Sequence, residues 1–178
     1  MTVTPATATY RPAVEADLAE ILTIYNHAIE TTTAVYSYQP QTLEMRREWY
    51  AAKQRDGHPV LVAERGGQVI GFGALGPFRA WPGYKYTVEN SIYVAEPYRG
   101  QGVGKLLLRP LIEAARRLEM HAVIAGIDAS NVASVHLHTS FGFHEVAHFK
   151  EVGYKFGRWL DLKFLELLLD TPLNPVDG

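Results

Sequence analysis

Cysteine is absent from this chain of 178 residues, and its absence excludes several kinds of chemistry. Without thiols there can be no disulfide, no thiolate metal site and no cysteine nucleophile, so any group transfer must use other side chains. The histidines do not replace it as metal ligands. His144 and His148 could share a strand face, but no set of histidines and carboxylates has convincing metal-binding spacing, and we expect no metal.

Long apolar runs and clusters of one charge are also scarce. No apolar stretch approaches the roughly 18 residues of a membrane span, and residues 1–9 lack the basic and apolar regions of a signal peptide. The formal net charge is −2, with lysine and arginine dispersed, which argues against a nucleic acid or an acidic membrane as partner. We therefore expect a cytoplasmic protein that binds a small molecule.

The composition and the hydrophobic periodicity predict one domain. Hydrophobic residues make up 47% of the chain, enough for a sizeable core. We expect a single domain over 1–178, with its core at about 8–170 and loose tails at 1–8 and 171–178. Helical spacing predicts helices from Leu18 to Ile29, after Thr42, from Leu107 to Leu118, and from Ser130 or Asn131 to Gly142. Strand patterns cover 60–64, 69–75, 86–94, 122–127, 145–152 and 158–169.

Local signals refine this outline. Asp17, with Glu20 three residues later, is a predicted cap of the first helix. The pair Gly66-Gly67 predicts a hairpin, because both glycines accept the positive φ of such turns. Two irregular segments, Thr31–Pro40 and the aromatic-rich Gly76–Tyr84, are predicted to form pocket walls.

The segment Ile92–Lys105 joins a strand pattern to a helix through a turn with alternating glycines at Gly100, Gly102 and Gly104. Glycine lets the backbone approach a ligand closely, and the amides that open a helix attract a negative group. The segment therefore predicts an anion site, although a glycine-rich turn without a ligand is the alternative.

Two well-known phosphate-binding loops do not fit this segment. A Walker loop needs serine or threonine after the lysine, where this chain has Leu106, and a dinucleotide fingerprint needs glycine in place of Lys105. The pattern Arg99-x-x-Gly102-x-Gly104 instead resembles the Arg/Gln-x-x-Gly-x-Gly/Ala signature of the GNAT acetyltransferase superfamily.

Within that superfamily the chain is similar to the phosphinothricin and methionine sulfoximine acetyltransferases. Four motifs carry this resemblance, and they occur in the expected order. They are Tyr84-x-Tyr86-Thr87-Val88-Glu89, Arg99 to Gly104, Asn131-x-x-Ser134-x-x-Leu137-His138-x-x-Phe141-Gly142-Phe143, and Val152-Gly153-x-Lys155-x-Gly157-x-Trp159-x-Asp161. The resemblance covers about residues 8 to 170. It implies an α/β fold with a mixed, mostly antiparallel central sheet of six to seven strands and about four helices.

The resemblance also implies an activity. It predicts an N-acetyltransferase that moves the acetyl group of acetyl-CoA directly to the α-amino group of a small amino-acid-like amine, in a ternary complex. It further implies a homodimer. For acetyl-CoA it implies a set of binding residues in the strand, the glycine loop and the next helix: Ile92, Tyr93, Val94, Arg99, Gly100, Gln101, Gly102, Val103, Gly104, Lys105, Asn131 and Ser134. A purely structural alternative, a helix cap, exists for Asn131.

The chemistry requires a base, because an α-amino group with a pKa near ~8 is largely protonated at neutral pH and has no lone pair. The resemblance assigns this role to Glu89, acting directly or through water. The alternative is a surface carboxylate paired with Lys85 or an arginine. The backbone amide of Val94 would stabilise the negative charge that develops on the carbonyl oxygen.

His138 stands where many superfamily members have a tyrosine near the thioester sulfur. An imidazole can donate or accept a proton near neutrality, so His138 is predicted to be an acid or a second base. The alternative is a packed helix histidine without a chemical role.

The acceptor site is predicted from the segment before the strand. Arg79 would hold a carboxylate, and the aromatic rings nearby would line a slot for the side chain. Trp81 replaces a basic residue of the phosphinothricin enzymes, which favours methionine sulfone or sulfoximine. The predicted substrate-binding residues are Phe78, Arg79, Ala80, Trp81, Tyr84, Glu89, Asn90 and Ser91. For the aromatic residues, ordinary packing or a dimer contact is the alternative.

Other functions stay open at this point. A protein N-terminus, a polyamine or an aminoglycoside could be the acceptor on the same scaffold. A catalytically silent module that only binds acetyl-CoA is the alternative from another class. The presence of both Glu89 and His138 weighs against the silent module.

Overall fold

The computed structural model describes residues 7–177, and in this range seven strands form one sheet. The strand order is β1-β2-β3-β4-β5-β7-β6, and every neighbouring pair is antiparallel except β4 and β5. The strands are β1 Thr9–Pro12, β2 Val60–Arg65, β3 Gln68–Pro77, β4 Thr87–Val94, β5 Ala122–Asp128, β6 His144–Lys155 and β7 Arg158–Leu168. This sheet confirms the predicted fold class.

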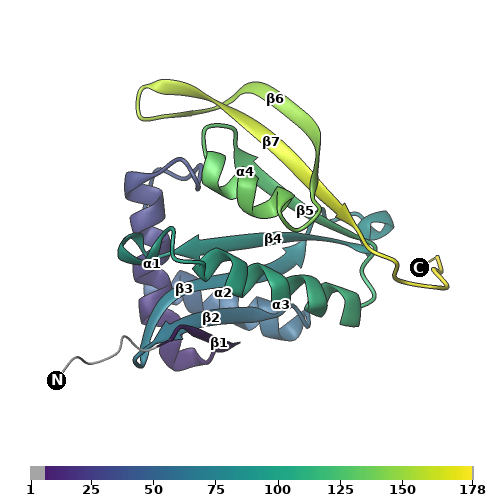
Figure 1. The fold of residues 1–178 in the computed structure, drawn as a ribbon, viewed down its shortest axis with the longest axis horizontal. Helices are drawn as coiled ribbons and strands as arrows, with labels where there is room; N and C mark the ends of the chain where they lie inside the picture. Colours follow the sequence, from purple (N-terminus) through teal and green to yellow (C-terminus); the bar gives the residue numbers. More distant parts are fainter. Residues whose placement is uncertain (1–6, 178) are drawn as a thin grey trace.

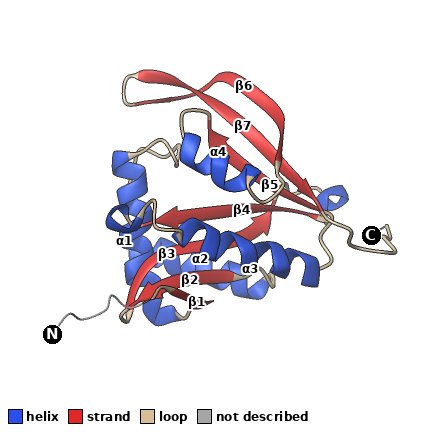
Figure 2. Cartoon of the chain, viewed as in Figure 1, coloured by secondary structure: helices blue, strands red, loops and turns tan. Residues whose placement is uncertain are grey.

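Helices cover both faces of the sheet, as Figures 1 and 2 show. In the described residues the α-helices are α1 Leu18–Thr31, α2 Leu43–Arg55, α3 Val103–Arg117 and α4 Val132–Thr139. Short 3-10 turns lie at Glu15–Asp17, Pro82–Tyr84 and Glu96–Tyr98. None of the helices within residues 7–177 combines the length and the apolar character that crossing a bilayer demands.

Two buried clusters hold these layers together. On one face Leu107, Leu108 and Leu111 of α3 are fully buried against the sheet, together with residues of β4, β5 and β7. On the other face Ile21 of α1 and Phe72 of β3 belong to a second cluster, against which α2 packs. Burying each large apolar side chain contributes roughly 1.5–3 kcal/mol, so both helix layers are fixed by their apolar stripes.

One predicted helix cap is wrong. The Asp17 carboxylate does not cap α1; it accepts two hydrogen bonds from the Arg11 guanidinium, at 2.7 and 2.9 Å, and one from the Val14 amide at 2.8 Å. A 3-10 turn precedes α1, and the paired, charge-assisted bonds to Arg11 outweigh a single bond to a helix amide. Glu20 instead accepts a bond from the Val69 amide at 3.2 Å.

The other predicted boundaries fall close to the observed ones. Thr42 caps α2 through a bond from the Met45 amide, and Gly66 has the positive φ of the predicted hairpin. The last helix, α4, ends at Thr139, and Gly142 follows with a φ of 88°. The predicted loose tail at 1–8 lies largely outside the described residues. The described part of the tail at 171–178 has no helix or strand, yet Val176 exchanges hydrogen bonds with the Tyr86 hydroxyl.

The pairing of β4 with β5 positions the site. These parallel strands pair only over Thr87–Glu89 with Ala122–Ile124, whereas β4 pairs with β3 as far as Val94. Beyond Glu89 the two strands therefore separate. The second half of β4 keeps one edge without a strand partner in the described chain.

Candidate active site

The open edge of β4 presents backbone groups to a ligand. Along a strand, successive residues direct their N–H groups to opposite sides. The Ala95 amide donates to the carbonyl of Ile70 in β3 at 2.9 Å, so the amide of Val94 faces the opposite side. The Val94 carbonyl on that side accepts a hydrogen bond from Arg99 Nε at 3.1 Å. The Val94 N–H is thus directed to the opening between β4 and β5.

Two cavities meet at this opening. The larger, of about 720 Å³, lies between β4, the glycine loop and the start of α4. The smaller, of about 390 Å³, lies over the end of β3 and the separated halves of β4 and β5. Both cavities are lined by Ala34, Ile92, Tyr93, Asn131 and Ser134, so the two cavities adjoin at these residues. This arrangement suits a reaction between a bulky donor and a small acceptor.

The glycine loop forms one end of the larger cavity. Gly100 and Gly102 have φ values of 73° and 85°, a region that favours glycine, and a Cβ on either would meet open space. Gly102 precedes α3, and the first amides of that helix lack helical partners and attract anions. Gly104 has a different role, because a Cβ there would lie 2.9 Å from Leu137 Cδ2; its absence lets α3 pack closely on α4.

Nearly all of the predicted acetyl-CoA residues line this cavity. The exception is Gln101, whose amide group bonds to the Arg65 side chain and to the Pro97 carbonyl, outside the larger cavity. The Asn131 side chain accepts a hydrogen bond from the Ser134 amide at 3.1 Å and also lines both cavities. Asn131 therefore caps the helix, and its position in the walls of both cavities is compatible with this cap.

Glu89 lies in the smaller cavity, at the last residue that pairs β4 with β5. Burial raises the pKa of this carboxyl, and the charge of Arg79, the nearby Gly126 amide and the charge of Lys53 oppose the shift. Within residues 7–177 Glu89 forms no ion pair within 4.0 Å, with Lys85 or with any other cation. A half-buried carboxyl with a raised pKa in a cavity is a candidate proton acceptor.

His138 is 3% exposed and lies between two oxygen atoms. Its Nδ1 is 2.8 Å from the Ser134 carbonyl oxygen, and its Nε2 is 3.0 Å from Oδ1 of Asn90. Burial lowers the pKa of His138, and the Ser134 carbonyl partly offsets this. His138 also lines the smaller cavity, so it is both packed and within reach of a ligand.

The predicted acceptor residues divide into two groups. Glu89, Asn90 and Ser91 line the smaller cavity. The five residues of the preceding loop line neither cavity in the described chain: Phe78, Arg79, Ala80, Trp81 and Tyr84. Trp81 is 76% exposed, and the Arg79 guanidinium lies 4.1 Å from the Phe78 ring centroid. Their role in substrate binding stays a prediction.

An aromatic cluster nevertheless connects this loop to the cavity. The Phe78 ring packs edge-on against Tyr84 and against Phe164 of β7, at centroid distances of 5.6 and 6.1 Å. A Cβ on Gly126 would lie 3.1 Å from the Phe164 ring and 3.0 Å from Oε1 of Glu89. The missing side chain of Gly126 therefore lets an aromatic ring and the carboxylate approach each other.

Three residues of the smaller cavity with polar side chains were not individually identified from the sequence: Tyr36, Lys53 and Asp128. Tyr36 belongs to the predicted wall 31–40, and its hydroxyl donates to Asp128 Oδ2 at 3.0 Å, a bond between segments 92 residues apart. Lys53 lies on α2, four residues after the partly buried Trp49. That spacing places Lys53 on the buried side of the helix, which is the signal that could have identified it.

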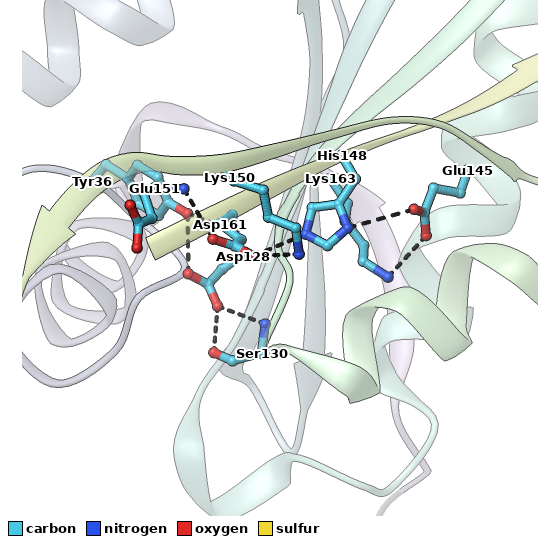
Figure 3. Close-up of polar contacts among 9 residues, drawn as sticks. All are labelled: Tyr36, Asp128, Ser130, Glu145, His148, Lys150, Glu151, Asp161 and Lys163. Atoms are coloured by element: carbon cyan, nitrogen blue, oxygen red, sulfur yellow. Dashed lines mark hydrogen bonds and ion pairs between the residues drawn. The ribbon is translucent and has the colours of Figure 1, made fainter. Parts of the chain in front are cut away.

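A polar network ties this wall to the β6–β7 hairpin (Figure 3). Asp161 accepts hydrogen bonds from His148 Nε2, Lys150 Nζ and the Glu151 amide at 2.9–3.1 Å, and together they lower its pKa to about 2. The two carboxylates near His148 are both paired with lysines: Asp161 with Lys150 and Glu145 with Lys163. Over residues 7–177 no group of three or more histidine, cysteine, aspartate or glutamate side chains is arranged to hold a metal ion.

The Acetyltransferase (GNAT) family profile matches residues 21–143. The chain belongs to the GNAT acetyltransferase family. This membership confirms the family resemblance that was based on the four motifs. It also confirms the prediction that the protein is an acyltransferase.

Individual GNAT relatives cover nearly the whole chain. A Salmonella typhimurium protein named L-methionine sulfoximine/L-methionine sulfone acetyltransferase is 46% identical over 94% of this chain and 98% of its own length. The structure of a ribosomal-protein-alanine N-acetyltransferase from Brucella melitensis is 51% identical, with a TM-score of 0.88 over 90% of this chain and 99% of that one. A phosphinothricin acetyltransferase from Sinorhizobium meliloti, solved in complex with acetyl-CoA, is 34% identical. Its TM-score is 0.91, and the match covers 95% of this chain and 92% of that one.

Proposed function

We propose that this GNAT protein transfers the acetyl group of acetyl-CoA to the α-amino group of a small amino acid of the methionine sulfone, methionine sulfoximine or phosphinothricin type. The observation that carries the proposal is the position of Glu89 in a cavity of about 390 Å³ that adjoins the glycine-loop cavity and shares part of its wall. The names of the Salmonella and Sinorhizobium relatives support this substrate class.

The larger cavity has the features that acetyl-CoA requires. The amides at the start of α3 and the positive-φ glycines offer donors for the pyrophosphate, and the open edge of β4 offers donors for the extended arm. The thioester would then reach the junction of the two cavities, close to Ile92 and Ser134.

The transfer proceeds in one ternary complex. The neutral amine attacks the thioester carbonyl carbon, so that a C–N bond forms as the C–S bond breaks. Glu89 first takes a proton from the ammonium form of the acceptor, directly or through water, which leaves the amine neutral. The nitrogen loses a second proton as the amide forms, and this proton passes to the departing thiolate. The Val94 N–H donates a hydrogen bond to the carbonyl oxygen as it becomes negative, and needs no reorganisation to do so.

We also propose that the protein is a cytoplasmic homodimer. Support for a dimer comes from exposed apolar side chains on the β6–β7 hairpin, where Val146, Val152 and Trp159 are 54%, 53% and 60% exposed. Exposed apolar groups of this kind commonly mark protein interfaces. Light scattering of the purified protein would give twice the monomer mass of 19.9 kDa.

Release of CoA thiol in the presence of an amine panel tests the activity. The panel contains methionine sulfone, methionine sulfoximine, phosphinothricin, a polyamine, an aminoglycoside and a peptide that begins with alanine. We expect turnover of the amino acids and at least a ~10-fold loss in the Glu89→Gln variant, with acetyl-CoA affinity nearly unchanged. The exposed Glu113→Gln variant is the matched control.

Two results would contradict the proposal. Preferred turnover of the alanine peptide would instead support the activity for which the Brucella protein is named. Binding of acetyl-CoA without thiol release for any amine would identify a silent module, despite the half-buried carboxyl at Glu89.

A further inference from the structure

Lys53 is a half-buried cation at the wall of the smaller cavity. It projects from α2 into the smaller cavity, and among residues 7–177 its Nζ makes no ion pair within 4.0 Å and no hydrogen bond. Burial lowers the pKa of Lys53, and the charges of Asp56 and Glu89 partly offset this. A partly desolvated ammonium that lacks a counter-charge favours an anionic ligand.

Gly76 determines where this ammonium lies. A Cβ on Gly76 would be only 2.1 Å from Lys53 Nζ, so the ammonium occupies the space that a side chain at this position would fill. Gly76 is the direct pairing partner of Glu89 in the antiparallel β3–β4 ladder. Side chains of such partners share a face, with Cβ atoms about 5 Å apart. The Lys53 ammonium therefore takes the place of the side chain that would face Glu89.

The result is a cation and a carboxylate that line one cavity and sense each other's charge without forming an ion pair within 4.0 Å. An α-amino acid carries its amino and carboxylate groups on the same carbon atom, so its two polar groups have the opposite polarity to this pair. We propose that Lys53 binds the α-carboxylate of the acceptor while Glu89 receives its amino group, so that Lys53, held over Gly76, selects α-amino acids among amines. This inference rests on the proposed function and adds a specificity residue to it.

Arg79 is the competing candidate for the carboxylate. Its charge acts on Glu89, but the side chain is exposed and lines neither cavity. Its guanidinium stacks on Phe78, and its Nη1 donates to the Phe78 carbonyl at 2.8 Å. Lys53 has no such competing contacts, and its ammonium is already inside the cavity that contains Glu89.

A pair of substrates that differ only in the carboxylate tests the proposal. Steady-state thiol release is measured with L-methionine sulfone and with its carboxamide at saturating acetyl-CoA. We expect the wild-type protein to prefer the acid. In Lys53→Met, KM for the acid should rise at least about tenfold, whereas kcat/KM for the carboxamide should change less than about threefold. Lys53→Arg should restore most of the preference, because it restores the charge.

Two further variants separate recognition from folding. Gly76→Ala keeps the Lys53 charge but displaces its flexible end, and should also reduce the preference for the acid. Arg55→Met removes a cation from the exposed side of the same helix and should leave both substrates unaffected. Acetyl-CoA affinity by calorimetry should be unchanged in all variants.

Several outcomes would overturn the proposal. Wild-type protein that turns over the carboxamide as well as the acid has no carboxylate recognition at this site. Equal losses for both substrates in Lys53→Met would show that Lys53 acts on Glu89 or on packing. A preference that survives Lys53→Met but disappears in Arg79→Met would assign the carboxylate to Arg79. By contrast, absence of thiol release by the wild-type protein with every amine would refute the proposed function itself.

Discussion

The imidazole of His138 and the side-chain amide of Asn90 are joined by a contact of 3.0 Å between Nε2 and Oδ1. The second ring nitrogen faces the Ser134 carbonyl at 2.8 Å, and Nδ2 of Asn90 donates to the Ile124 carbonyl at 3.2 Å. Both partners of the ring are therefore acceptors. A neutral imidazole has one N–H, and only a protonated ring satisfies both contacts.

Burial opposes that protonation, because it lowers the pKa of His138. An added proton thus completes a hydrogen-bond chain but is weakly held, which suits a group that takes up a proton and releases it. We predict that Asn90→Asp raises the His138 pKa, because a carboxylate stabilises the imidazolium, and that Asn90→Leu lowers it. Imidazole ¹⁵N chemical shifts measure both effects, and a His138→Gln sample identifies the signal. Identical titration curves in the three proteins would refute the coupling.

The ionisation of Glu89 should cost stability. Because burial raises its pKa, the folded protein holds the Glu89 proton more tightly than the unfolded chain does. The resulting stabilisation is complete below the ordinary pKa of 4.5 and is lost as the pH rises through the higher folded-state value. We predict that Glu89→Gln becomes more stable relative to wild type as the pH rises from 4 to 7, measured by urea unfolding. A constant difference across this range would contradict the raised pKa.

The same shift predicts the acidic side of the pH–rate profile. The base works only as a carboxylate, so kcat/KM should fall as the pH is lowered through a pKa above 4.5. Stopped assays between pH 4 and 9 at subsaturating amine test this, after correction for the ionisation of the amine. An acidic limb at or below 4.5 would show that a water-exposed carboxylate, and not Glu89 in its half-buried position, is the base.

The Val94 amide should be required for catalysis but not for the sheet. Its N–H faces the open edge of β4, so Val94→Pro removes this donor without removing a bond to β3. We predict a loss of about 10²- to 10³-fold in kcat, the usual effect of deleting one oxyanion donor. Val94→Ala is the matched control, because it trims the side chain and keeps the amide. Similar kcat values for the two variants would exclude the amide from the transition state.

Lys155 should stabilise the loop after α1, whose residues line both cavities. It is 4% exposed, and its ammonium donates hydrogen bonds to the carbonyls of Ile29, Thr32 and Val35, which belong to the end of α1 and the loop after it. Lys155→Met leaves these acceptors without a donor, and we predict a loss of about 2–4 kcal/mol in the free energy of unfolding.

Equilibrium unfolding in urea measures that loss, with exposed Lys85→Met as the control. Because Thr32 lines the larger cavity, acetyl-CoA affinity should fall as well. A stable Lys155→Met protein with unchanged affinity would show that the loop is held by Tyr36 and its neighbours without the ammonium.

Much of the fold could be predicted from local sequence. The apolar stripe of α3, the Thr42 cap of α2 and the Gly66-Gly67 turn all act within a few residues of chain, so their signals are visible in the sequence. The Asp17 cap could not be predicted, because Arg11 competes for the same carboxylate, and this competition depends on the 3-10 turn that brings the two together.

The sequence by itself determined the composition of the site: a glycine loop ahead of a helix, a carboxylate in the strand that precedes this loop, and a histidine within the following short helix. These features are local, and the GNAT family motifs record them in order. Only the tertiary structure decided which groups meet. The separation of β4 from β5 after Glu89 opens the junction between the cavities, and α2 delivers Lys53 to the gap left by Gly76, from 23 residues earlier in the chain. Such meetings depend on strand register and helix packing, which are set by contacts between distant segments.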